Sequence, residues 1–254
     1  MAEHHGKHAL VTGGGTGIGL DIATALAAAG AQVTITGRNK DRLDSIATDT
    51  PGLHPLAMDV TDEASVRDGI TEAIAARGPV TICVANAGIA EAAPFAKETL
   101  THWRQVLGTN LDGAFLTFQS VLTALPDKTP ARMIAISSIA GVRGLKNAIA
   151  YTASKHGVIG LIRGLSEEYM GTPITFNAIC PGYVDTPIVD RNAAQIAAHQ
   201  GISEADARAY LAKGNRHRTL LEVEEITATA LWLCSDAARS VNGQTIQIAG
   251  GQVS

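Results

Sequence analysis

The stretch Thr12-Gly13-Gly14-Gly15-Thr16-Gly17-Ile18-Gly19 lies between a short apolar run and an Ala- and Leu-rich run. Glycines at such a junction let the backbone turn tightly and approach a phosphate group closely. A helix that starts directly after the turn presents free N–H groups and the positive end of its dipole. The stretch therefore predicts a first strand, a first helix and a dinucleotide site between them.

The same alternation of short apolar runs and longer Ala- and Leu-rich runs continues along the chain. It predicts strands at residues 7–12, 31–36, 53–57, 80–84, 132–137, 174–179 and 245–248, and helices at 18–29, 40–48, 62–77, 99–125, 150–170 and 222–235. Thr61 is the expected N-cap of the third helix. We expect an α/β fold: a single Rossmann-type domain over residues 1–254, with a doubly wound parallel sheet and helices on both faces.

One segment interrupts the alternation. About forty residues between Pro181 and Glu222 contain no strand, only two Ala-rich helical pieces at 192–199 and 203–212. Open α/β sheets bind ligands beyond the carboxyl ends of their strands, and this segment follows such an end. We expect a substrate lid at about residues 186–221, rather than a decoration without function.

Composition excludes several classes of protein. Hydrophobic residues make up 46% of the chain and charged residues 17%, which excludes charge-rich disorder. A net charge of −4 argues against a surface that binds nucleic acid. No apolar run has the length of a membrane span, and the first residues lack the apolar segment of a signal peptide. We therefore expect a cytoplasmic protein without a membrane or nucleic-acid partner.

The residues that most often ligate metals suggest no metal site. Cys83, Cys180 and Cys234 each lie among apolar neighbours, as small buried residues in a reducing compartment do. His4 and His5 precede the first strand together with His8, and we expect a solvated N-terminal segment there.

Further motifs follow the glycines in a fixed order. They are Asn86-Ala87-Gly88 after the fourth strand, Asn110 in a long helix, Ser138 at the end of the fifth strand, Tyr151-x-x-x-Lys155 at the start of the next helix, and Pro181-Gly182 with Thr186 after the sixth strand. This ordered set resembles the short-chain dehydrogenase/reductase family over essentially the whole chain. Two residues depart from the family's usual motifs, Ala85 in place of Asn and Ala249 in place of Asp, and neither removes a catalytic group.

The resemblance implies a catalytic set of Asn110, Ser138, Tyr151 and Lys155. Tyr151 would be the general acid and base, Ser138 would hold the carbonyl oxygen, and Asn110 would position a water that links Lys155 to solvent. Tyr151 and Lys155 are four residues apart on one helix face, and a nearby ammonium favours the phenolate. Taken singly, each residue also has an ordinary structural interpretation. Tyr151 and Lys155 could be a common amphipathic helix pair. Ser138 could cap the strand end, and Asn110 could be a buried or helix-capping amide.

The resemblance also implies which residues bind the nicotinamide cofactor. These are Gly13, Gly15, Thr16, Gly17, Ile18, Gly19, Arg38, Asp59, Val60, Asn86, Ala87, Gly88, Tyr151, Lys155, Pro181, Gly182, Val184 and Thr186. Asp59 would contact the adenine or else cap a helix, and Thr186 would bind the carboxamide of the nicotinamide.

The end of the second strand favours NADP over NAD. Gly37 stands where an NAD-preferring enzyme places an acid, and Arg38 follows it. The guanidinium could bind a 2′-phosphate, although it could also stack on the adenine or point to water. The glycine stretch itself contains no Lys or Arg.

The sequence constrains the identity of the substrate less than that of the cofactor. The lid resembles that of 3-hydroxybutyrate dehydrogenases, but Ala90, Ala140 and Ala148 stand where those enzymes bind a small carboxylate. An anion there would lack partners, so an apolar ketone or a 3-oxoacyl thioester is the expected substrate. Arg143 and Lys146 could meet a distant phosphate or be solvated loop charges.

The predicted activity is an NAD(P)-dependent oxidoreductase (EC 1.1.1.-) that interconverts a secondary alcohol and a ketone by hydride transfer. A non-redox enzyme of the same fold, such as a dehydratase or an epimerase, is one alternative. A cofactor-binding regulatory protein is another. The resemblance also implies a homotetramer, with helices 99–125 and 150–170 at an interface.

Overall fold

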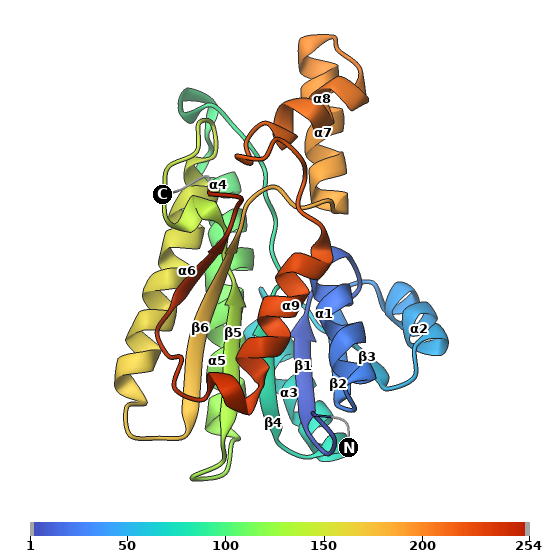
Figure 1. The fold of residues 1–254 in the computed structure, drawn as a ribbon, viewed down its shortest axis with the longest axis vertical. Coiled ribbons are helices and arrows are strands. Elements are labelled where there is room, and N and C mark those ends of the chain that lie inside the picture. Colours follow the sequence, from blue (N-terminus) through green and yellow to red (C-terminus); the bar gives the residue numbers. More distant parts are fainter. Residues whose placement is uncertain (1–2, 252–254) are drawn as a thin grey trace.

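A computed structural model describes residues 3–251, so both ends of the predicted 1–254 domain lie outside the described residues (Figure 1). All strands of the sheet are parallel, in the order β3-β2-β1-β4-β5-β6-β7. Their bounds are β1 His8–Thr12, β2 Gln32–Gly37, β3 Leu53–Ala57, β4 Val80–Ala85, β5 Ala131–Ile136, β6 Ile174–Pro181 and β7 Thr245–Ile248. The doubly wound α/β fold is confirmed.

Helices cover both faces of the sheet because each buried strand points alternate side chains to opposite sides. The covering helices are α1 Gly17–Ala28, α2 Lys40–Asp49, α3 Glu63–Arg77, α5 Gly113–Thr123, α6 Ile149–Glu168 and α9 Val223–Cys234. In the core of one face, α3, α5 and α6 pack on strand residues such as Leu10 and Met133. In the other core, α1, α2 and α9 pack on Val11 and Ile134.

Two local predictions are wrong. The helix expected at 99–125 is divided into α4 Leu100–Leu107, a π-helical turn at Gly108–Asp112, and α5. The N-cap of α3 is Asp62 instead of Thr61, because the Asp62 carboxylate accepts hydrogen bonds from the first-turn N–H groups of Ala64 and Ser65. A carboxylate there also interacts favourably with the helix dipole.

The expectation of a solvated N-terminal segment is wrong for two of its three histidines. His4 is fully buried, and His8 lies within β1, where its ring nitrogens contact the Gly78 carbonyl oxygen and the Thr34 hydroxyl at 2.7 and 2.8 Å. Burial lowers the pKa of both rings. His5 is exposed, as expected.

The three cysteines are buried and free, as predicted. Within residues 3–251, no group of three or more His, Cys, Asp or Glu is arranged to hold a metal ion. None of the helices in that range has both the length and the apolar character to cross a membrane.

The predicted lid segment forms two helices beyond the carboxyl edge of the sheet, α7 Pro187–Gln200 and α8 Glu204–Ala212 (Figure 1). Helix α7 starts five residues earlier than the expected 192 because Pro187 occupies its first turn, where proline fits without losing a hydrogen bond. A single parallel bridge between Val184 and Leu221 brings the two ends of the segment together.

Candidate active site

The strand order reverses between β1 and β4, so the loops that follow these two strands diverge at the carboxyl edge of the sheet. Asn86 holds the loops together there. Its Nδ2 donates to the carbonyl oxygens of Thr12 and Gly13, at 2.9 and 3.2 Å. The Thr12 hydroxyl accepts from the backbone N–H groups of Asn86 and Ala87. The crevice between the loops is where doubly wound sheets bind nucleotides.

The glycine loop is shaped so that its backbone is accessible. Gly13 has a positive φ of 64°, and a Cβ on Gly19 would lie 2.3 Å from Asn86 Nδ2. A cavity of about 630 Å³ opens beside the loop, lined by Gly13, Gly15, Thr16, Thr36, Gly37, Arg38, Asn39, Lys40, Asp41, Arg42 and Leu43. Its bare backbone at the start of α1 fits the phosphates and ribose of a dinucleotide.

Asp59 and Val60 follow β3 at the adjacent edge. One carboxylate oxygen of Asp59 accepts hydrogen bonds from the backbone N–H and the hydroxyl of Thr61, at 2.9 and 2.8 Å. The backbone donor holds the pKa of Asp59 below its ordinary value, and the charge of Arg38 acts in the same direction. Asp59 therefore does not cap α3, and its carboxylate is ionised beside Arg38. The Val60 side chain packs against Gly113.

The predicted catalytic residues come from three elements and meet at the carboxyl ends of β4 and β5. Ser138 lies two residues beyond β5, and its Oγ accepts from the Ala140 N–H at 3.1 Å. The capping role considered for Ser138 is therefore present. Tyr151 and Lys155 lie on consecutive turns of α6, with Lys155 Nζ 5.7 Å from the centre of the tyrosine ring.

Lys155 and Asn110 are both buried, and both are held by backbone groups. Lys155 Nζ donates to the Ile136 carbonyl oxygen at 2.8 Å. The Asn110 amide accepts from the Ile89 N–H and donates to the Ile89 carbonyl oxygen and to Ser154 Oγ. The Asn110 side chain therefore holds the loop after β4, and the π-helical turn places it there.

Burial shifts the pKa values of Tyr151 and Lys155. Desolvation raises the pKa of Tyr151, with the side chain of Ser138 acting in the opposite direction. Desolvation lowers the pKa of Lys155 to about 8. Both shifts favour the neutral forms of the two side chains. The expectation that the Lys155 ammonium, helped by a bound cationic nicotinamide, favours the Tyr151 phenolate stays a prediction.

The residues after β6 return the chain to the glycine loop. Gly182 donates its N–H to the Ile248 carbonyl oxygen, which aligns the end of β6 with β7. Val184 forms the bridge at the base of the lid. The position of a Cβ on Gly17 is 3.3 Å from the methyl group of Thr186, so the start of the lid touches the loop.

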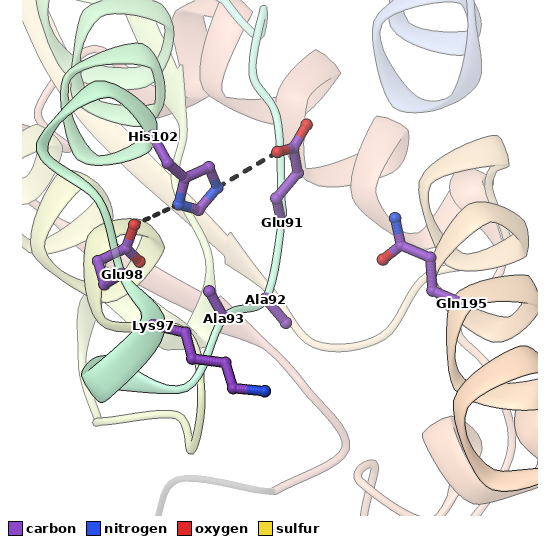
Figure 2. Close-up of a pocket in the computed structure, with 7 residues that line it drawn as sticks. All are labelled: Glu91, Ala92, Ala93, Lys97, Glu98, His102 and Gln195. Carbon is purple, nitrogen blue, oxygen red and sulfur yellow. Dashed lines mark hydrogen bonds and ion pairs between the residues drawn. The ribbon is translucent and has the colours of Figure 1, made fainter.

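A second, polar cavity of about 290 Å³ lies between the loop after β4 and lid helix α7. Figure 2 shows its lining residues, Glu91, Ala92, Ala93, Lys97, Glu98, His102 and Gln195. The His102 ring lies between two carboxylates, with Nδ1 2.5 Å from Glu98 and Nε2 3.2 Å from Glu91. Gln195 faces Glu91 and Lys97 from the opposite side. Because Ala93 pairs with Ala148, three residues before Tyr151, this cavity borders the predicted substrate site.

The residues expected near the substrate differ in accessibility. Ala90 and Ala148 are half-buried, but Ala140 has no exposed surface, so the expectation that Ala140 lines an open pocket is wrong. Lys146 is exposed. Arg143 is half-buried, and its Nε is buried without a hydrogen-bond partner in the described chain.

Sequence reasoning missed three residues that shape the site. Thr12 joins the two loops, and its position directly before the glycines was the available signal. Arg42 lines the cofactor-sized cavity from the first turn of α2, and the sequence contained no signal for it. Asn215, fully buried, binds the backbone N–H and carbonyl groups of Tyr183 across 32 residues, and no sequence pattern indicates such a contact.

A dinucleotide crevice at the switch point, next to a tyrosine, a lysine and a serine, defines a nicotinamide-dependent oxidoreductase of the Rossmann type. The family model for short chain dehydrogenases matches residues 7–197. The chain belongs to this family, as the resemblance implied. It is an NAD(P)-dependent oxidoreductase that interconverts a secondary alcohol and a ketone.

Individual relatives cover nearly the whole chain. An acetoacetyl-CoA reductase of Rhizobium meliloti is 36% identical over 96% of this chain and 97% of its own length. A putative ketoacyl reductase of the granaticin polyketide synthase of Streptomyces violaceoruber is 35% identical, over 96% and 92%. A crystal structure of a variant of actinorhodin polyketide ketoreductase with NADPH has a TM-score of 0.93 and 28% identity, covering 97% of both chains.

Proposed function

We propose that this protein is an NADPH-preferring reductase of a 3-oxoacyl thioester. The observation that carries the proposal is the grouping of Ser138, Tyr151 and Lys155 beside a crevice in which Gly37 and Arg38 replace an acidic ribose ligand. A bound nicotinamide would supply the hydride at this site. The proposal includes the other predicted cofactor contacts, from Gly13 to Thr186.

The residues divide the work of reduction among them. Tyr151, whose pKa is raised by burial, is protonated at neutral pH and donates its proton to the forming alkoxide. Ser138 holds the carbonyl oxygen next to the tyrosine hydroxyl. Lys155, buried with its pKa lowered to about 8, binds the cofactor ribose and returns a proton to Tyr151. Asn110 positions the loop that borders both groups.

Two observations favour a thioester over a purely apolar ketone. The cavity beside Gln195 is polar, which suits the amide groups of a thioester arm better than a hydrocarbon. Several relatives are named for ketoacyl and acetoacetyl-CoA reduction. The half-buried Ala90 and Ala148 provide no partner for a small carboxylate. An apolar ketone is the second candidate, because these alanines accept it equally well.

A cytoplasmic location and a homotetramer complete the proposal. Both derive from the sequence and the family resemblance. The exposed Leu100 and Phe115, on the helical segment that the resemblance assigns to an interface, support self-association.

The test measures kcat/KM with NADPH and with NADH for acetoacetyl-CoA, an aryl ketone and acetoacetate. We expect the thioester to exceed acetoacetate by at least tenfold and NADPH to exceed NADH by a similar factor. Preference for acetoacetate would contradict the substrate argument, and preference for NADH would contradict the cofactor argument. Absence of nicotinamide turnover with every substrate would favour the non-redox or regulatory alternatives.

A further inference from the structure

The loop after β4 is joined to the segment that leads into α6. Its Ala93 N–H donates to the Asn147 carbonyl oxygen at 2.8 Å, and Ala93 forms a parallel bridge with Ala148. Asn147 and Ala148 directly precede α6, which carries Tyr151 in its first turn. The loop therefore lies beside the cleft at Tyr151, and a shift of the loop would change the space available to a substrate.

The same loop is tied to α4 through Glu91, whose side chain lies beside the His102 ring (Figure 2). His102 Nε2 is 3.2 Å from a carboxylate oxygen of Glu91, and His102 Nδ1 is 2.5 Å from a carboxylate oxygen of Glu98. A neutral imidazole carries a proton on one nitrogen only, and the other nitrogen presents a lone pair. Because both nitrogens face carboxylate oxygens, the arrangement fits the imidazolium form of His102.

The two carboxylates hold the ring with different firmness. The Glu98 side chain is 8% exposed, precedes His102 by one helical turn and also accepts from the Thr99 N–H. The Glu91 side chain is 38% exposed and forms no second ion pair within residues 3–251. Loss of one ring proton would therefore keep the bond to Glu98 and turn a lone pair toward Glu91, whose carboxylate would be repelled.

The other charged groups around His102 are exposed or bind elsewhere. In the lining of the cavity, η1 Phe95–Lys97 contributes the exposed Lys97, and α7 contributes the neutral Gln195. Helix α6 packs against α4, but its Lys155 and His156 bind backbone carbonyl oxygens. The remaining charged residues of α4, the π-helical turn and α6 are exposed, namely Arg104, Asp112, Arg163, Glu167 and Glu168. The two glutamates are therefore the ionisable groups in contact with the ring.

We propose that His102 is a positioning residue for carbonyl reduction, and that its imidazolium form holds Glu91 and the loop after β4 in the conformation that binds the carbonyl substrate. The inference rests on the proposed function, because it assumes that the substrate lies between this loop and Tyr151. Histidine is the side chain whose charge ordinarily changes near neutral pH. Substrate binding should therefore weaken as the pH rises. Cofactor binding should not follow the charge of His102, because other residues line the cavity beside the glycine loop.

The first experiment measures the KM for acetoacetyl-CoA with saturating NADPH at about pH 6 and about pH 8.5. In the wild type we expect this KM to rise about fivefold, the upper end of the range for a partly exposed ion pair. His102→Gln removes the charge and should give the higher KM at both pH values. His102→Lys is charged at both and should give the lower KM at both. His156→Gln removes an exposed histidine of α6 and is the matched control, which should keep the wild-type profile.

The second experiment needs no turnover. It measures hydrogen–deuterium exchange of the backbone amides of residues 89–98 without cofactor, corrected for the intrinsic pH dependence of exchange. In the wild type these amides should exchange faster at about pH 8.5 than at about pH 6. His102→Gln and Glu91→Gln should show the faster exchange at both pH values. The buried strand β4 is the internal reference and should not change.

The outcomes separate this inference from the proposed function. Reduction of acetoacetyl-CoA with a KM that rises in H102Q as it does in the wild type would overturn the role of His102 alone. Loop exchange that responds neither to pH nor to E91Q would also overturn it, and E91Q keeps this test available if H102Q does not fold. Loop exchange that follows the charge of His102 in a protein without any carbonyl reduction would overturn the proposed function, while the hold of His102 on the loop would stand.

Discussion

Tyr151 and Lys155 are four residues apart on α6, but their side chains differ in burial and in hydrogen bonding. The lysine ammonium is buried and donates to a backbone carbonyl of β5, whereas the tyrosine is half-buried. Burial moves their pKa values in opposite directions, upward for the tyrosine and downward for the lysine. At neutral pH this leaves a proton on the phenol, which is the state required for reduction.

Replacing Tyr151 with Phe removes the hydroxyl and keeps the ring. We expect turnover to fall by about 10²–10⁴-fold, the usual contribution of a general acid, because no other described group occupies this position. The dissociation constant for NADPH should stay within twofold of the wild-type value. Steady-state kinetics and a cofactor titration on one preparation would check both.

The same substitution at Tyr169, at the far end of α6 where the ring packs on Phe176, is the matched control. It should leave turnover unchanged. A Tyr151→Phe protein that keeps more than about a tenth of the activity would refute the role of the hydroxyl.

At the scale of elements, the lid is a small unit with its own apolar contacts. Helices α7 and α8 bury Val189, Ala193, Ala197, Ala207 and Leu211 against one another. Arg208 of α8 joins the pair to the strand end, through ion pairs with Asp190 in α7 and with Asp185, the latter at 2.7 Å. Arg208 is therefore one of the contacts that join α7 and α8 to the segment after β6, together with the Val184–Leu221 bridge and the hydrogen bonds of Asn215 to Tyr183.

Arg208→Gln should loosen this connection without unfolding the sheet. Exposed ion pairs contribute about 0.2–1 kcal/mol each, so we expect the KM for the carbonyl substrate to rise about two- to fivefold. The KM for the cofactor should change less, and limited proteolysis should cut the lid faster. Arg191→Gln is the control, an exposed arginine of α7 without an ion pair in the described chain. Identical behaviour of the two variants would show that Arg208 does not hold the lid.

At the scale of the whole molecule, burial of Lys155 lowers the free energy of unfolding by an amount that depends on pH. Its pKa is about 8 in the fold and 10.5 in an exposed lysine. Between these values the unfolded chain binds more protons than the folded chain, so this group makes stability rise with pH. Below the lower value both states are protonated, and the folded state bears the full penalty of about 3 kcal/mol.

Lys155→Met removes this titration. The difference in unfolding free energy between variant and wild type should therefore shift by about 3 kcal/mol in favour of the wild type from about pH 7 to about pH 10. Urea unfolding of both proteins without cofactor, at several pH values, measures it. Lys213→Met, at an exposed position, is the control variant and is measured in the same way. A constant difference for K155M would mean that Lys155 titrates as an exposed lysine does.

The sequence by itself determined the strands, the fold class and the order of the motifs, because these depend on local patterns. Strands covered on both faces leave continuous apolar runs, and β4 at Val80–Ala85 lies within one residue of its prediction. The glycine loop was predictable for the same reason, since it joins a strand to a helix within a few residues.

Only the tertiary structure decided the features that depend on contacts between distant residues. Contacts with elements far away in the sequence determine three of these features. They are the π-helical turn at Asn110, the burial of His8 beside Thr34 and the burial of Ala140. The same holds for Arg42, which reaches the glycine loop only when α2 packs against β2 and β3. Local propensity acts over a few residues, whereas burial and charge pairing depend on which surfaces the whole fold brings together.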